Sequence, residues 1–215
     1  MKAIILTSNG FATSYLAARL AERLALLLGL TNLAGVRMAY IPNAADPLRN
    51  KNYQLRSQKL IRALGVDLHL VDLEQPRAEV RRQLVKAAVL YVEGGNTFHL
   101  MYHLRQSGLD KDLKEYSHLI YVGSSAGSIV AGPNVQAAVL AGDVNRDIDQ
   151  TDLRGLGLVS FIIWPHYALW SSWRLFFSMP GRGRHRALFF TKVIPLRNGE
   201  AIVIRPGHRR ERLKM

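Results

Sequence analysis

The chain has 215 residues, of which 48% are hydrophobic, a length that suits one well-buried domain and is short for two. It contains no cysteine, which excludes a thiol nucleophile, thiolate metal sites and disulfide bonds. The formal net charge is +13, and +9 of it lies from Tyr167 onward, where eleven Lys or Arg residues outnumber two acids. The basicity is therefore a local feature of the C-terminal part.

Apolar, strand-like runs alternate with helical patterns along the whole chain. The predicted strands are Ala3–Leu6, Val36–Ile41, Asp67–Val71, Ala87–Val92, Leu119–Val122, Leu158–Trp164 and Ala201–Ile204. The clearest predicted helices are Ala12–Leu28, Gln54–Leu64, Arg77–Val85 and Thr97–Gln106. This alternation predicts an α/β fold in which helices cover both faces of a mostly parallel sheet and ligands bind at the carboxyl ends of the strands. No linker or repeat interrupts the pattern, so residues 1–215 are predicted to be a single domain.

The N-terminal region carries no signal for export or membrane insertion. Met1–Thr7 is too short an apolar stretch for a secretory signal, and it has one positive charge. The leucine-rich run Leu24–Leu30 follows charged residues at 19, 22 and 23 and falls short of the roughly 20 apolar residues that a span requires. We therefore expect a cytoplasmic protein without a membrane span.

The segment Gly123-Ser124-Ser125-Ala126-Gly127 is the most informative motif in the chain. It follows a predicted strand and precedes the apolar run Ser128-Ile129-Val130. It fits Gly-x-Ser-x-Gly, a strand-to-helix elbow that exposes the central hydroxyl. Ser125 is therefore a candidate nucleophile, although a motif this short also occurs in ordinary tight turns.

Two further strand ends supply partners for Ser125. Gly94-Gly95 follows one predicted strand, and its bare backbone N–H groups could face a developing oxyanion. His166 follows another, with its backbone stiffened by Pro165. Serine, histidine and N–H donors at three strand ends predict an acyl-transfer site.

The motifs together resemble the peptidase E (aspartyl dipeptidase) family of serine peptidases, which also includes cyanophycinase-type enzymes. The resemblance rests on Gly94-Gly95-Asn96-Thr97-Phe98, then Gly123–Ser128, then Pro165-His166-Tyr167, and also on two earlier segments, Lys2–Gly10 and Ala39–Pro47. It implies a fold like that of the class I glutamine amidotransferases, flavodoxin-like and three-layered, with serine in place of their cysteine.

The resemblance also implies roles for named residues. Ser125 would form an acyl-enzyme, His166 would act as base and then acid, and the N–H groups of Gly95 and Ala126 would hold the oxyanion. Asn96, Thr97 and Arg174 are candidate substrate-binding residues. The expected substrate is a short peptide, with N-terminal aspartate favoured by the family. No metal or other cofactor is expected.

Two positions in the sequence are candidates for the acid that would orient His166. Asp143 lies between the serine and the histidine, on a predicted loop, and we assign it this role. A later turn is the alternative, but Asn198 stands there where relatives often carry Asp or Glu, with Glu200 two residues on.

Residues 168–190 form an atypical basic and aromatic segment without a single acid. The favoured interpretation is a structural helix with a basic surface, since aromatic residues at helical spacing usually face a core. A second is that its arginines, Arg174, Arg182 and Arg184 among them, attract acidic substrates toward Ser125. Contact with nucleic acid or an anionic membrane is the least favoured.

Two other functions remain open at this stage. An α/β-hydrolase esterase would share the elbow, but its acid and histidine usually lie farther downstream than the 41 residues that separate Ser125 from His166. A catalytically drifted, amidotransferase-like binding module with a basic C-terminal surface is the stronger alternative. The oligomeric state, with a homodimer among the alternatives, is left open.

Overall fold

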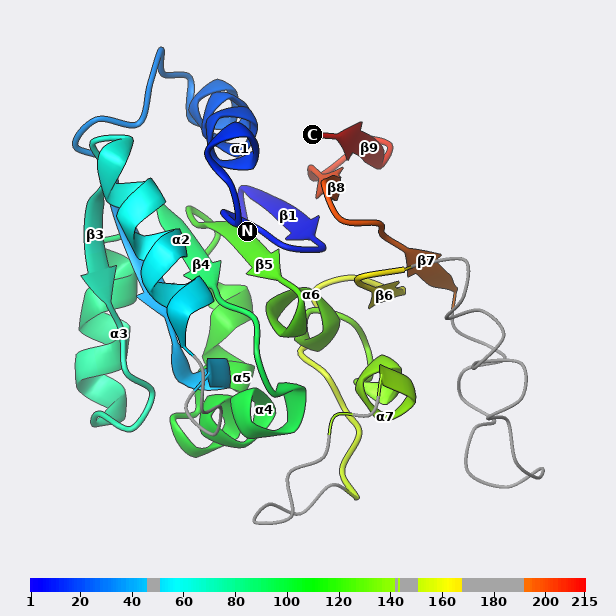
Figure 1. Ribbon diagram of the computed structural model, residues 1–215. Coiled ribbons are helices and arrows are strands. Elements are labelled where there is room, and N and C mark those ends of the chain that lie inside the picture. The colour runs from blue at the N-terminus through cyan, green and yellow to red at the C-terminus, as the bar shows by residue number, and fades with distance from the viewer. Residues whose placement is uncertain (46–50, 142, 144–150, 168–191) are drawn as a thin grey trace.

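The computed structural model describes residues 1–45, 51–141, 143, 151–167 and 192–215. Its main feature is a seven-stranded sheet in the order β3-β2-β4-β5-β1-β8-β9 (Figure 1). The parallel strands are β1 (Ala3–Thr7), β2 (Arg37–Ile41), β3 (Asp67–Leu70), β4 (Val89–Val92) and β5 (Ile120–Ser124). The strands β8 (Glu200–Ile204) and β9 (Glu211–Lys214) extend the β1 edge in antiparallel orientation.

Helices cover both faces of this sheet, because side chains of each strand alternate between two cores. Ile5 points into one core with α1 (Ser14–Leu28) and α2 (Asn52–Ala63). Leu6 points into the other, which the remaining helices cover. These are α3 (Arg77–Val85), α4 (Thr97–Gln106), α5 (Leu109–Asp112), α6 (Ala126–Val130) and α7 (Gln136–Ala141), with short 3₁₀ turns at Asn43–Ala45 and Leu113–Glu115. The predicted α/β class, with helices on both faces of a mostly parallel sheet, is confirmed.

A second, two-stranded sheet lies beside the main one. It pairs β6 (Ile162–Trp164) with β7 (Val193–Pro195) in parallel. The predicted strand Leu158–Trp164 is therefore longer than the observed strand β6. It was expected in the main sheet but pairs with β7 in the second sheet. Its first residues bond elsewhere, since the backbone N–H groups of Leu158 and Val159 both donate to Ala131 O.

Within the described residues no helix is long and apolar enough to cross a membrane. The segment 168–190, including Arg174, lies outside the described residues, and the oligomeric state stays open.

Candidate active site

Ser125 lies at the carboxyl end of β5, in a conformation that few non-glycine residues adopt. Its φ is 48° and its ψ is −107°, at the junction of β5 and α6. The neighbouring glycines allow α6 to pack this closely. A Cβ on Gly127 would lie 2.2 Å from Val92 O, and one on Gly123 would lie 2.5 Å from Gly127 O. The elbow predicted from the sequence is therefore present.

Hydrogen bonds to the end of β1 hold this strained turn. Ser125 N donates to Thr7 O at 3.2 Å. The Ser128 hydroxyl oxygen lies 2.8 Å from both Thr7 O and Gly123 O and accepts from Thr7 N at 2.9 Å. Strain of this kind costs about 1–3 kcal/mol and persists only where the surroundings fix the backbone.

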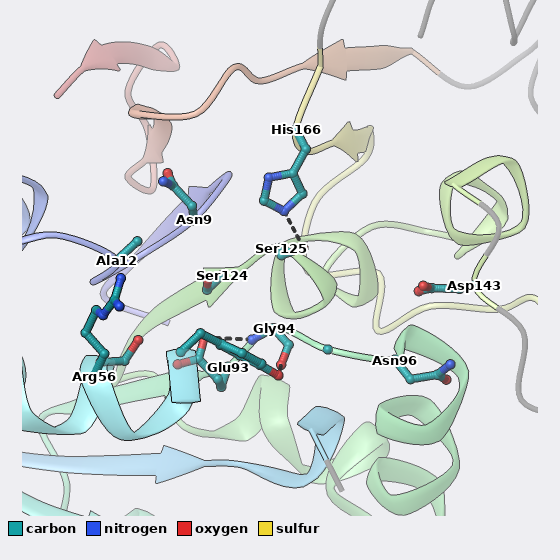
Figure 2. Close-up of a pocket in the computed structure, with 13 residues that line it drawn as sticks. Asn9, Ala12, Arg56, Glu93, Gly94, Asn96, Ser124, Ser125, Asp143 and His166 are labelled. Atoms are coloured by element: carbon teal, nitrogen blue, oxygen red, sulfur yellow. Dashed lines mark hydrogen bonds between the residues drawn. The ribbon is translucent and has the colours of Figure 1, made fainter. Parts of the chain in front are cut away.

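His166 faces Ser125, although the two residues follow strands of different sheets. It follows β6, and its φ of 55° turns the side chain toward β5. His166 Nε2 lies 3.0 Å from Ser125 Oγ (Figure 2). The structure thus brings together the serine and the histidine that the sequence selected.

The other imidazole nitrogen faces Asn198. His166 Nδ1 lies 2.7 Å from Asn198 Oδ1. The β6–β7 pairing explains this contact, because Leu196 N donates to Trp164 O and Tyr167 N donates to Leu196 O, which draws the turn after β7 against the histidine. With an oxygen at Nδ1, the imidazole proton belongs on Nδ1 and the lone pair on Nε2 faces Ser125.

Asp143 does not contact His166, so the assignment of Asp143 as its orienting acid is corrected. The Asp143 carboxylate accepts hydrogen bonds from Thr97 N at 3.1 Å and Thr97 Oγ1 at 2.7 Å. Thr97 begins α4, where the first backbone N–H groups lack partners within the helix and attract a carboxylate. Glu200 is also engaged elsewhere, since its carboxylate accepts from Arg197 N at 2.8 Å and pairs with Arg212 at 2.6 Å.

The backbone N–H groups of the glycine turn after β4 differ in whether they have an acceptor among the described residues. Gly94 N donates to Glu93 Oε1 at 2.8 Å and Asn96 N donates to Ala44 O at 2.7 Å. Among the described residues, neither Gly95 N nor Ala126 N has a protein acceptor. Gly95 must be glycine here, because its φ is 146° and a Cβ would lie 2.1 Å from Ala44 O.

Glu93, a buried carboxyl to which the sequence analysis gave no role, stabilises this turn by a hydrogen bond to Gly94 N. It is 2% exposed, and it accepts from Tyr40 Oη at 2.7 Å as well as from Gly94 N. Burial raises the pKa of Glu93, while these hydrogen bonds oppose the rise. Burial and the nearby Glu93 also raise the pKa of Tyr40.

A pocket of about 430 Å³ opens in front of Ser125. Its lining includes Ser125, His166, the Glu93–Asn96 turn, Asp143 and, from α2, Arg56. In Figure 2 Arg56 and Asp143 lie at opposite ends of the view with Ser125 between them. Of the predicted substrate-binding residues, Asn96 lines the pocket and Thr97 is fully buried beside Asp143. Arg56 was missed because a single arginine on a polar helix resembles any solvated side chain.

Comparison with known proteins places this chain in a family. A sequence model of peptidase family S51 matches residues 4–211. The chain therefore belongs to peptidase family S51 and is a peptidase by family, as the resemblance to peptidase E predicted.

Individual relatives agree with this assignment. An uncharacterized peptidase of Listeria monocytogenes is 30% identical over 140 residues, which cover 64% of this chain and 68% of the relative. Peptidase E of Nostoc is 34% identical over 134 residues, covering 61% of this chain and 52% of its own length. A crystal structure of a candidate peptidase E from Listeria monocytogenes superposes with a TM-score of 0.78 at 26% identity, covering 100% of this chain and 99% of that one.

Proposed function

We propose that this chain is a serine peptidase that hydrolyses short peptides through an acyl-enzyme on Ser125. The observation that carries the proposal is the 3.0 Å approach of His166 Nε2 to a serine hydroxyl held at a strained elbow. That pair is the minimum needed to activate a serine as a nucleophile.

The reaction follows from the two hydrogen bonds of the imidazole. His166 Nε2 takes the Ser125 proton as Oγ attacks the scissile carbonyl carbon, and Nδ1–H donates to Asn198 Oδ1 throughout. The protonated imidazole then gives its proton to the leaving amine, and the C–N bond breaks. Water, deprotonated by the same nitrogen, attacks the acyl-enzyme and releases the acid.

The N–H groups of Gly95 and Ala126 are the proposed oxyanion donors. Support comes from their lack of protein acceptors within the described chain, whereas the N–H groups on either side of Gly95, those of Gly94 and Asn96, donate to protein oxygens. Donors fixed in advance toward developing negative charge typically contribute 10²–10³ each in kcat, roughly 3–4 kcal/mol.

The charges of the pocket suit a small zwitterionic substrate. Arg56 supplies a guanidinium, which can bind a carboxylate through two parallel hydrogen bonds. Asp143 keeps one carboxylate oxygen free of the Thr97 contacts and can accept from a substrate ammonium group. We expect dipeptides with N-terminal aspartate among the substrates, with Arg56 in place of Arg174 as the described cation that would select them.

Labelling with a fluorophosphonate tests the nucleophile. Intact-mass analysis should show one adduct, which Ser125→Ala removes and Ser117→Ala does not. Ser117 is an exposed serine before the start of β5, at the end of the strand opposite to Ser125. If the folded protein gives no adduct, the proposal fails and the alternative of a drifted binding module gains support.

Paired substrates test the specificity. Asp-Leu should be cleaved faster than Asn-Leu at low salt, and Arg56→Gln should reduce that ratio toward one. A ratio of one already in the unmodified protein would show that no cation reads the side chain. If Ala-Leu is cleaved faster than Ala-Leu amide only when Arg56 is present, the terminal carboxylate is its ligand instead.

A further inference from the structure

Ser8 touches both the loop that carries His166 and the turn that carries Asn198. It directly follows β1, and its side chain is 0% exposed. Its hydroxyl oxygen accepts from the backbone N–H of His166 at 2.8 Å and donates to Asn198 Oδ1 at 3.1 Å. Ser8 therefore contacts the two residues whose side chains form the 2.7 Å imidazole–amide pair.

An amide partner creates an ambiguity that a carboxylate does not. The side chain of Asn198 has an acceptor at one end and a donor at the other, and the two ends have nearly the same shape. With Oδ1 toward His166, the imidazole carries its proton on Nδ1 and Nε2 can accept the proton of Ser125. With the amide turned by half a rotation, Nδ2–H would face Nδ1 and the proton would move to Nε2. In serine proteases this wrong tautomer lowers kcat by about 10⁴.

We infer that Ser8 is a positioning residue that fixes the orientation of the Asn198 amide and, through it, the tautomer of His166. The inference rests on the proposed function of the Ser125–His166 pair. Because the Ser8 oxygen already accepts from His166 N, its own proton is directed to the next acceptor, which is Asn198 Oδ1.

The turned amide would leave that proton without a good acceptor. Within the described chain the other neighbour of Ser8 Oγ is His166 Nδ1 at 3.5 Å, a nitrogen that the turned amide would itself occupy. A buried hydroxyl without an acceptor is unfavourable, so Ser8 favours the orientation in which Nε2 can act as a base.

Other contacts hold the turn around Asn198 without contacting its side-chain amide. Gly199 N donates to Asn9 Oδ1 at 3.0 Å, and Ser8 N donates to Glu200 O at 3.2 Å. Both involve the backbone of the turn, so neither distinguishes Oδ1 from Nδ2 of Asn198. Among the described residues, Ser8 and His166 are the ones whose side chains meet that amide.

Four variants test this inference by rate: Ser8→Ala, Asn198→Asp, the double variant, and Ser107→Ala as a matched control. Ser107 is a buried serine whose hydroxyl donates to Leu104 O at 3.1 Å, outside the pocket lining. Ser8→Ala should lower the fluorophosphonate labelling rate and kcat/KM by about 10-fold or more. In the Asn198→Asp background the same change should matter less than about 3-fold, because a carboxylate accepts at both ends.

The ¹⁵N NMR shifts of the imidazole report the tautomer without requiring activity, with the His166 signal assigned from a His166→Gln sample. We expect the Nδ1–H form in the unmodified protein and a mixture in Ser8→Ala. An unchanged tautomer in Ser8→Ala, or an equal rate loss in both backgrounds, would overturn the inference. If the unmodified protein gives no adduct, but the tautomer of His166 changes as expected in Ser8→Ala, the proposed function fails and the inference stands. Should Ser8→Ala not fold, Ser8→Cys keeps the size and weakens the donor.

Discussion

Replacing Asn198 by aspartate should make Ser125 more reactive. The reaction creates a positive imidazolium at His166, and in the unmodified protein the group beside Nδ1 is a neutral amide at 2.7 Å. A carboxylate at the same place would stabilise that charge as it develops, while the Ser8 hydroxyl, 3.1 Å from Oδ1, could still donate to it. The positive charge forms only when the imidazole takes the Ser125 proton, so the gain appears in the transition state.

The size of the gain follows from Coulomb's law. Two unit charges about 4 Å apart interact by roughly 1 kcal/mol in water and roughly 4 kcal/mol at an effective dielectric constant of 20. Because both His166 and Asn198 are exposed, the value belongs near the aqueous end. About 1–1.4 kcal/mol corresponds to roughly a 5–10-fold higher rate.

The assay is the second-order rate of fluorophosphonate labelling, measured at pH 8 for every variant. Asn32→Asp is the matched control, since it adds the same charge at an exposed position in the loop between α1 and β2. An unchanged or lower rate in Asn198→Asp, with an unaltered fold, would refute the electrostatic reasoning. A rise of the same size in Asn32→Asp would assign the effect to net charge instead.

Three further changes probe the surroundings of the pair. Gly95→Ala should lower kcat by about 10²–10³, because the new Cβ would lie 2.1 Å from Ala44 O and must displace a proposed oxyanion donor. A thermal melt checks that the variant is folded, and an unchanged rate of fluorophosphonate labelling would contradict the prediction. Glu93, whose pKa burial raises, keeps its proton to higher pH in the folded protein than in the unfolded chain, so stability falls as pH rises from about 4.3, the unfolded value, toward the folded pKa. Glu93→Gln should remove that loss of stability. Urea titrations at pH 4 and pH 8 give the free energy of unfolding of the variant minus that of the unmodified protein, and this difference should increase with pH. An equal difference at both pH values would contradict the prediction. Asp143→Asn should raise KM for unblocked dipeptides more than it lowers kcat, as expected for an ammonium ligand next to Thr97, whereas a fall mainly in kcat would return Asp143 to a role in the chemistry.

The parts of the site that could be predicted from sequence are those that each follow a local signal. Ser125 and His166 come shortly after apolar runs, and a strand end next to a glycine or proline is visible without any long-range information. Helix limits depend on local sequence as well, and the predicted limits of α3 and α4 agree with the structure.

The parts that failed depend on contacts between distant segments. Asn198 reaches the imidazole through the pairing of β6 with β7, a strand of three residues that is too short to show a period. Asp143 looked suitable from its place between Ser125 and His166, but chain order does not reveal that the first turn of α4 takes up its carboxylate. The antiparallel direction of β8 likewise follows from its pairing with β1 and from no pattern of its own.

The division of the Ser125–His166–Asn198 group between two sheets gives the protein a weak point that is separate from its overall stability. Ser125 belongs to the seven-stranded sheet, whereas the other two residues follow strands of the small β6–β7 sheet. Each β6–β7 strand has three residues, so few backbone bonds need to open before the imidazole leaves the hydroxyl. Titration with urea should therefore abolish labelling at a lower concentration than it melts the helices. Inactivation would then record the separation of the small parallel β6–β7 sheet from Ser125 while most of the chain is still folded.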